Sequence, residues 1–217
     1  MGFVASLVVK VPARTQSRKP LAVIVERHET ETNILTIMAI TKTELPKNSI
    51  LKTNNMTYDY IDSFQGQFID KFQKIGTTEI GKSFFSSGPK WIDKLFAFRN
   101  KLVGLFGLKT SGKIIDRQKM LENFKCEKGQ QIGLFKVFDK TTDEIILGED
   151  DKHLNFRVSL FIDKQNENKT DKNLIISTTV KFNNWFGRLY FLPVRPFHKL
   201  IVPTMLKGII KNIEQQN

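Results

Sequence analysis

The chain has 217 residues, 40% of them hydrophobic, and a net charge of +12. This length and apolar content suit one domain with a sizeable core and leave room for a small appendage. No apolar run reaches about eighteen residues, so the sequence predicts no membrane-spanning helix. The single cysteine, Cys126, excludes an internal disulfide or a cysteine-based zinc site and favours a reducing compartment, the cytoplasm. No histidine stands near it in the sequence, so we interpret it as a structural thiol.

The positive charge favours acidic partners: nucleic acid, an anionic membrane or an acidic protein. Residues 90–128 contain ten Lys and Arg against four acids, and residues 181–217 contain six against one. The excess is spread along expected helices, without a helix-turn-helix, zinc-finger or aromatic RNA-binding signature, so no nucleic-acid partner is expected. A solvated basic surface is the main interpretation, and weak association with an anionic membrane surface is the alternative.

Residues 1–40 show no clean periodicity, and they predict a weakly ordered N-terminal extension. A packed strand around Leu21–Val25 is the alternative. The main domain is expected over residues 41–217. It begins with a polar segment at Thr41–Ser49, broken by Pro46, and a first strand near Met56–Phe68.

A pair of helices is expected after this strand. Thr77-Thr78-Glu79 can cap a short helix that runs to Phe85 and stops at Ser86-Ser87-Gly88-Pro89. From Trp91 onward, the apolar spacing predicts a second, amphipathic helix that ends at Gly107.

Four strands are expected next, at Gln131–Phe138, Glu144–Gly148, His153–Asp163 and Leu174–Phe182. Within the third, alternate residues from Leu154 to Ile162 are apolar, which is typical of a half-buried antiparallel strand.

The C-terminal end is expected to be helical from Pro196, with an apolar stripe along one side. Pro203 lies inside this pattern; it removes the backbone bond to Lys199 and predicts a bend there. A strand, a helix pair, a run of strands and a long helix together indicate an α+β domain in which an antiparallel sheet wraps around the C-terminal helix.

Three stretches carry a resemblance to a known family: Gly148–Ser159, Asn184–Phe191 with Pro196–Val202, and Trp91–Leu108. They resemble motifs of DUF2867, a family of uncharacterised bacterial proteins, and the resemblance covers about Thr41 to Ile213. It implies the helix-grip fold of the START and polyketide-cyclase (SRPBCC) superfamily, in which a curved sheet grips a long helix around an apolar cavity. The fold hosts binders and enzymes alike, so it does not select a chemistry.

Polar residues near these motifs are the candidates for a site. Asp150, Asp151 and His153 could form an acid–base group or a metal site, but adjacent acids at a turn favour structural hydrogen bonds, so we predict no metal. His198, near the expected start of the last helix, could pair with a carboxylate, although a structural role is favoured.

Arginines and one tyrosine complete the candidates. Arg99 and Arg157 could receive an anion, while an internal ion pair of Arg157 with Asp150 or Asp151 is the favoured alternative. Arg188 and Tyr190 could shape a cavity mouth, or Gly187-Arg188 could be a turn. The ligand-binding set that we predict is Arg99, Asp151, His153, Arg157, Tyr190 and His198.

Three functions follow. The first is a cavity that binds an apolar or amphipathic small molecule, without a cofactor. The second is a cyclase- or hydratase-type enzyme that uses a histidine and an aspartate, and the third is a peripheral protein of anionic membranes. The sequence predicts no particular oligomeric state.

Overall fold

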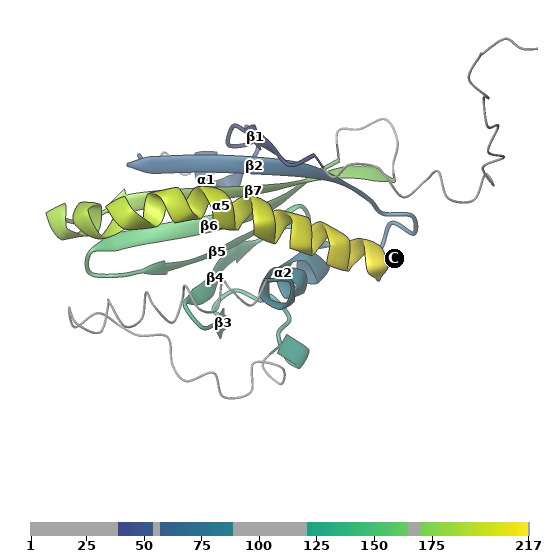
Figure 1. Ribbon diagram of the computed structural model, residues 1–217. Helices are drawn as coiled ribbons and strands as arrows, with labels where there is room; N and C mark the ends of the chain where they lie inside the picture. Colours follow the sequence, from purple (N-terminus) through teal and green to yellow (C-terminus); the bar gives the residue numbers. More distant parts are fainter. Residues whose placement is uncertain (1–38, 54–56, 89–120, 165–169, 217) are drawn as a thin grey trace, which may run out of the picture. The chain divides into compact units, whose positions relative to one another are not determined.

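The computed structural model describes residues 39–53, 57–88, 121–164 and 170–216 (Figure 1). All of them belong to one compact unit, Ile37–Asn217. The expected N-terminal extension lies almost wholly outside the described residues. The helix expected from Trp91 lies outside them too, whereas the shorter helix expected before it lies within them.

The fold is α+β, as predicted, with a seven-stranded antiparallel sheet in the order β1-β2-β7-β6-β5-β4-β3. The strands are β1 (Thr41–Thr43), β2 (Tyr60–Ile69), β3 (Gln131–Ile132), β4 (Phe135–Lys140), β5 (Glu144–Asp150), β6 (Leu154–Asp163) and β7 (Asp171–Phe182). The first long strand, β2, pairs with the last, β7, over ten residue pairs from Tyr60↔Val180 to Ile69↔Asp171. This pairing places the first long strand beside the last, inside an open sheet whose edges are β1 and β3.

Three described helices accompany the sheet: α1 (Ile50–Thr53), α2 (Thr77–Ser86) and α5 (Trp185–Gln215). The long helix α5 crosses one face of the sheet, and α2 lies beside its C-terminal end (Figure 1). This is the helix-grip arrangement of a sheet around a C-terminal helix. Gly66 of β2 permits the close approach, because a Cβ atom there would lie 2.6 Å from Ile210 Cδ1 of α5.

The main core lies between α5, α2 and the sheet face that they cover. Alternate residues of β6 reach this face, as their periodicity predicted, and β5, β7 and the end of β2 add to it. In α5, the core residues Leu206, Ile209, Ile210 and Ile213 are all fully buried. A second, smaller apolar cluster lies under the first part of α5 and contains Leu154, Val180 and Phe191.

Several predicted boundaries were wrong. The last helix begins at Trp185, not at Pro196, so Pro193, Pro196 and Pro203 all lie inside it. Asn184 caps it, because the Asn184 side chain accepts a hydrogen bond from the Gly187 backbone N–H at 3.2 Å. His198 therefore lies well inside the helix. The bend expected near Lys199 stays a prediction.

Smaller corrections concern the strands. The polar segment Thr41–Ser49, for which no strand was predicted, contains β1, and α1 follows it. The strand expected at Gln131–Phe138 is a tight hairpin of β3 and β4, which turns at Gly133 with a φ of 60°. Such a positive φ is adopted readily by glycine.

Candidate functional site

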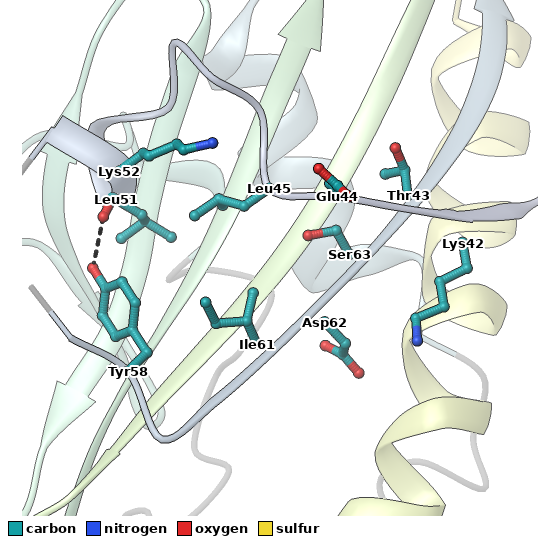
Figure 2. Close-up of a pocket in the computed structure, with 10 residues that line it drawn as sticks. All are labelled: Lys42, Thr43, Glu44, Leu45, Leu51, Lys52, Tyr58, Ile61, Asp62 and Ser63. Atoms are coloured by element: carbon teal, nitrogen blue, oxygen red, sulfur yellow. Dashed lines mark hydrogen bonds between the residues drawn. The ribbon is translucent and has the colours of Figure 1, made fainter.

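A pocket of about 400 Å³ lies beside the first part of β2, where β1 and α1 border it. Figure 2 shows its lining residues in two groups. Apolar side chains of Leu45, Leu51 and Ile61 gather near the Tyr58 ring at one end, while Lys42 and Asp62 extend toward α5 at the other. Lys52 lies beside Leu51, and Glu44 lies between the two groups, so the pocket combines an apolar end with charged side chains along its length.

The register of the sheet explains this division. Lys42 of β1 pairs with Phe64 of β2, so it shares the α5 face with Phe64 and with Asp62 two residues away. Because β1 stops at Thr43, opposite Ser63, the residues of β2 before Ser63 have no β1 partner. The pocket lies along this uncovered length of the strand.

The wall opposite β2 is held by a buried carboxylate. Glu144 accepts hydrogen bonds from the Ser49 hydroxyl at 2.6 Å, the Ile50 N–H at 2.7 Å and the Ser159 hydroxyl at 2.5 Å. A buried carboxylate with three donors is well compensated, so it anchors the start of α1 to the sheet. Tyr58 adds a bond from its hydroxyl to the Leu51 carbonyl at 2.9 Å (Figure 2).

Asp62 is the centre of a polar cluster beneath α5. Its Oδ2 atom accepts a hydrogen bond from the Tyr60 hydroxyl at 2.6 Å and lies 3.1 Å from His198 Nδ1 of α5. We call Tyr60, Asp62 and His198 the Asp62 cluster. Arg195 extends it, with its guanidinium carbon 5.5 Å from the centre of the Tyr60 ring. The cluster thus joins β2 to the helix across the interface.

The electrostatics of the cluster favour a protonated tyrosine. Burial, the hydrogen bond to Asp62 and the charge of that carboxylate all raise the pKa of the Tyr60 phenol well above its usual range. Tyr60 therefore remains a hydrogen-bond donor to Asp62 at any physiological pH. The second donor is His198, whose bond to Asp62 orients the ring and directs Nε2 away from the carboxylate.

The second carboxylate oxygen of Asp62 differs from the first in its hydrogen bonding. Asp62 is only 6% exposed, yet its Oδ1 atom has no hydrogen-bond partner within the described ranges. The same holds for the buried hydroxyl of Thr178, which is directly opposite Asp62 in the register of β2 and β7. Buried polar atoms of proteins nearly always have partners. The acceptor and the hydroxyl lie side by side on the α5 face, and a polar group of a ligand would reach them only where α5 moves away from β2.

The surroundings of the Asp62 cluster are apolar. Phe191 packs edge-on against the Tyr60 ring with centroids 4.8 Å apart, and the Phe182 ring lies 5.6 Å from that of Phe191. Apolar walls around a few oriented polar atoms are typical of small-molecule sites. Among the described residues, no group of three or more His, Cys, Asp or Glu is placed to hold a metal ion.

The predicted site residues do not converge. Asp151 and His153 belong to a turn that leads into β6: the Asp151 side chain accepts from the His153 N–H at 3.1 Å. His153 Nδ1 lies 3.2 Å from Asn184 Oδ1, and its ring lies 4.7 Å from that of Phe186. These contacts connect the turn to the start of α5, in keeping with the structural alternative.

Arg157 projects from the opposite sheet face, since its neighbours Phe156 and Val158 lie on the α5 side. It pairs with Asp150 at 2.7 Å and lies 3.5 Å above the Phe138 ring. It also donates to the Phe156 and Glu149 carbonyls. Arg157 thus forms the favoured internal ion pair.

The remaining candidates are dispersed. Tyr190 lies in α5 and packs partly against the small apolar cluster. Arg188 lies in the first turns of α5, 69% exposed and 3.9 Å from Asp59, so Gly187-Arg188 is part of the helix. Arg99 lies outside the described residues. Of the predicted set, only His198 belongs to the Asp62 cluster.

Asp62 and Tyr60 were missed, although the sequence holds a signal for the first. Tyr60, Asp62, Phe64 and Phe68 are alternate residues of one strand, and Asp62 is the lone acid on an otherwise apolar face. A buried acid needs a partner. That partner, His198, is 136 residues away.

The fold and the pocket define a helix-grip-like α+β domain with a polar cluster between the sheet and the gripping helix. The family described as "Protein of unknown function (DUF2867)" matches residues 56–205, more than half of the chain, and the chain belongs to this family. No curated protein and no solved structure matches this chain.

Proposed function

We propose that the protein binds a small amphipathic molecule in the pocket beside β2. The observation that carries this proposal is the buried Asp62 carboxylate, which lines the pocket and has one oxygen without a partner in the described part of the chain. Ile61 lies on the opposite sheet face from Asp62, so a ligand would follow the free edge of β2, with its apolar part against Leu45, Leu51 and Ile61 and a hydrogen-bond donor directed at Asp62 on the α5 face. The seven-stranded order and the C-terminal helix also support membership of the START and polyketide-cyclase superfamily.

The charge of the site selects the head group. Asp62 offers an acceptor, so at this residue an ammonium or hydroxyl head is favoured over a carboxylate, which would meet a like charge, while Lys42 and Lys52 reduce the difference. The expected order of affinity is decan-1-amine, then decan-1-ol, then decanoate. Native mass spectrometry of the full chain with each amphiphile measures this order.

The decisive variant is Asp62→Asn, which keeps the size of the side chain and removes its charge. Loss of one charge-assisted bond is expected to weaken decan-1-amine binding about tenfold or more. Asp150→Asn is the matched control, because Asp150 pairs with Arg157 rather than lining the pocket. Equal binding by wild type and Asp62→Asn, or no binding of any amphiphile, would contradict the proposal.

The Asp62–His198 pair supports a second candidate, an enzyme of cyclase or hydratase type. A carboxylate that orients a histidine through Nδ1 leaves Nε2 to accept or donate a proton. The structure thus points to His198 rather than His153 as the proton carrier. Any hydration or cyclisation activity found on a substrate panel should be lost in His198→Gln and kept in His153→Gln. Activity that survives in His198→Gln would remove this histidine from the reaction.

A further inference from the structure

The N-terminal segment of α5, residues 185–203, is apolar on its outer side as well as on its inner side. Trp185 is 73% exposed and Leu192 64% exposed, and Leu189, Phe197 and Leu200 are also more than half exposed. Trp185, Leu189, Leu192 and Leu200 return to the same side of the helix at their spacing. We call these four residues the apolar stripe. Large apolar side chains gathered on one exposed face mark an interaction surface.

Cations border this stripe. Arg188, Arg195 and Lys199 follow one another along one flank of the helix at intervals of seven and four residues, and all three are exposed. Residues 185–203 contain no Asp or Glu, and the whole chain carries a charge of +12. The nearest acid that the structure pairs with this flank is Asp59, 3.9 Å from Arg188. The surface therefore combines apolar contact with an unbalanced positive charge.

We propose that this face of α5 lies on the surface of an anionic membrane. Apolar side chains flanked by Lys and Arg are the composition of helices that lie in the plane of a bilayer interface. Trp185 at one end fits this position, since tryptophan favours the boundary between lipid and water. A second copy of the chain fits the face less well, because the basic flanks of two copies would meet without an acid between them.

The prolines limit the depth of insertion. Pro193, Pro196 and Pro203 cannot donate to the carbonyls of Leu189, Leu192 and Lys199, which the helix would otherwise bond. Carbonyls without partners are unfavourable in hydrocarbon, whereas water and lipid head groups can satisfy them. No helix within the described ranges is long and apolar enough to cross a membrane. The helix is therefore expected to lie at head-group level.

The test is flotation of the full chain with vesicles of phosphatidylcholine, with and without phosphatidylserine. Wild type is expected to float with vesicles that contain phosphatidylserine and not with vesicles of phosphatidylcholine only. The fraction that floats should fall as the salt concentration rises. At about 1 kcal/mol for each basic residue, Arg188→Gln with Lys199→Gln should weaken binding about thirtyfold. Leu189→Ser with Leu192→Ser should abolish flotation, because it removes half of the apolar stripe, and the core stays intact because both side chains are exposed.

The charge-matched control is Lys128→Gln with Lys136→Gln, at the β3–β4 edge of the sheet, which should float like wild type. Thermal unfolding of every variant establishes that the fold is retained. Three results would overturn the proposal: no flotation of wild type, equal loss in the two glutamine pairs, or dimers in size-exclusion chromatography that Leu192→Ser dissociates. The experiment uses no decan-1-amine, decan-1-ol or decanoate and leaves Asp62 unchanged, so its failure is separate from failure of the proposed pocket.

Discussion

The two segments of α5 differ in what they bury and in what they expose. The C-terminal segment, residues 204–215, presses Leu206, Ile209, Ile210 and Ile213 into the main core and turns Lys207 and Lys211 outward. The N-terminal segment covers a small apolar cluster and a charged pair, His198 and Asp62, while it exposes the apolar stripe. The two segments of this helix therefore differ in role: the C-terminal segment stabilises the domain, and the N-terminal segment carries the features suited to binding.

The largest effect should come from shortening a core side chain of the C-terminal segment. Ile209 is fully buried, so Ile209→Ala leaves a cavity and should lower the free energy of unfolding by about 3 kcal/mol. Leu192→Ala, in the N-terminal segment, removes an exposed side chain and should change it by less than about 0.5 kcal/mol. Urea unfolding of both variants measures the difference, and similar losses would show that the two segments are not distinct.

The next effect is at the start of the helix. A Cβ atom on Gly187 would lie 2.1 Å from the His153 carbonyl oxygen, which is backbone and cannot rotate away. Gly187→Ala should therefore destabilise the domain by about 2 kcal/mol, the usual range for overpacking. Gly88→Ala, where no atom lies within 4 Å, is the control and should be nearly neutral. Thermal unfolding that does not separate the two variants would mean that the helix start is loosely held.

A smaller effect is expected from the cap. Asn184→Ala removes the side-chain acceptor of the Gly187 N–H and a contact of His153, and should cost about 1 kcal/mol. Because the cap belongs to the N-terminal segment, hydrogen exchange should accelerate in the first turns of α5 alone. Faster exchange at Leu206–Ile213 would show instead that the helix unfolds as one unit.

The smallest effect at neutral pH concerns Cys126, which lies fully buried in the main core. Burial raises the pKa of this thiol from 9.0 to about 11. The unfolded chain therefore loses the proton first, and the stability contributed by Cys126 is complete below pH 9 and lost as the pH rises to about 11. The fall in melting temperature over this window should be shallower in Cys126→Ala. An unchanged slope, or rapid reaction of the native thiol with a disulfide reagent at pH 7, would contradict its burial.

Strict alternation made β6 and β7 predictable, because a strand with one face on a core repeats every two residues. The start of α5 was not predictable by the same rules, since prolines are read as helix breakers. Here the affected carbonyls belong to Leu189, Leu192 and Lys199, which are exposed residues, so water can replace the lost bonds. The Asn184 cap, tied to His153, sets the start upstream of them.

The candidate site was less accessible from sequence than the fold. The sequence prediction selected histidines and turn acids. In the structure, Asp151 and His153 make local contacts, and Arg157 forms an ion pair with Asp150 on the other sheet face. His198 was selected without its partner, because the pairing with Asp62 depends on how α5 crosses β2. The periodicity of a single strand or helix does not predict where α5 crosses β2, although the periodicity of β2 does indicate that Asp62 is a buried acid.

The central claim is that ligand binding acts on the N-terminal segment of α5 through Asp62. Hydrogen–deuterium exchange of the full chain, with and without decan-1-amine, tests it most directly. The account predicts added protection at Tyr60–Ser63 and at residues 191–199, none at Leu206–Ile213, and loss of the added protection in Asp62→Asn. Protection that is absent, or that is equal in the two segments of the helix, would contradict it.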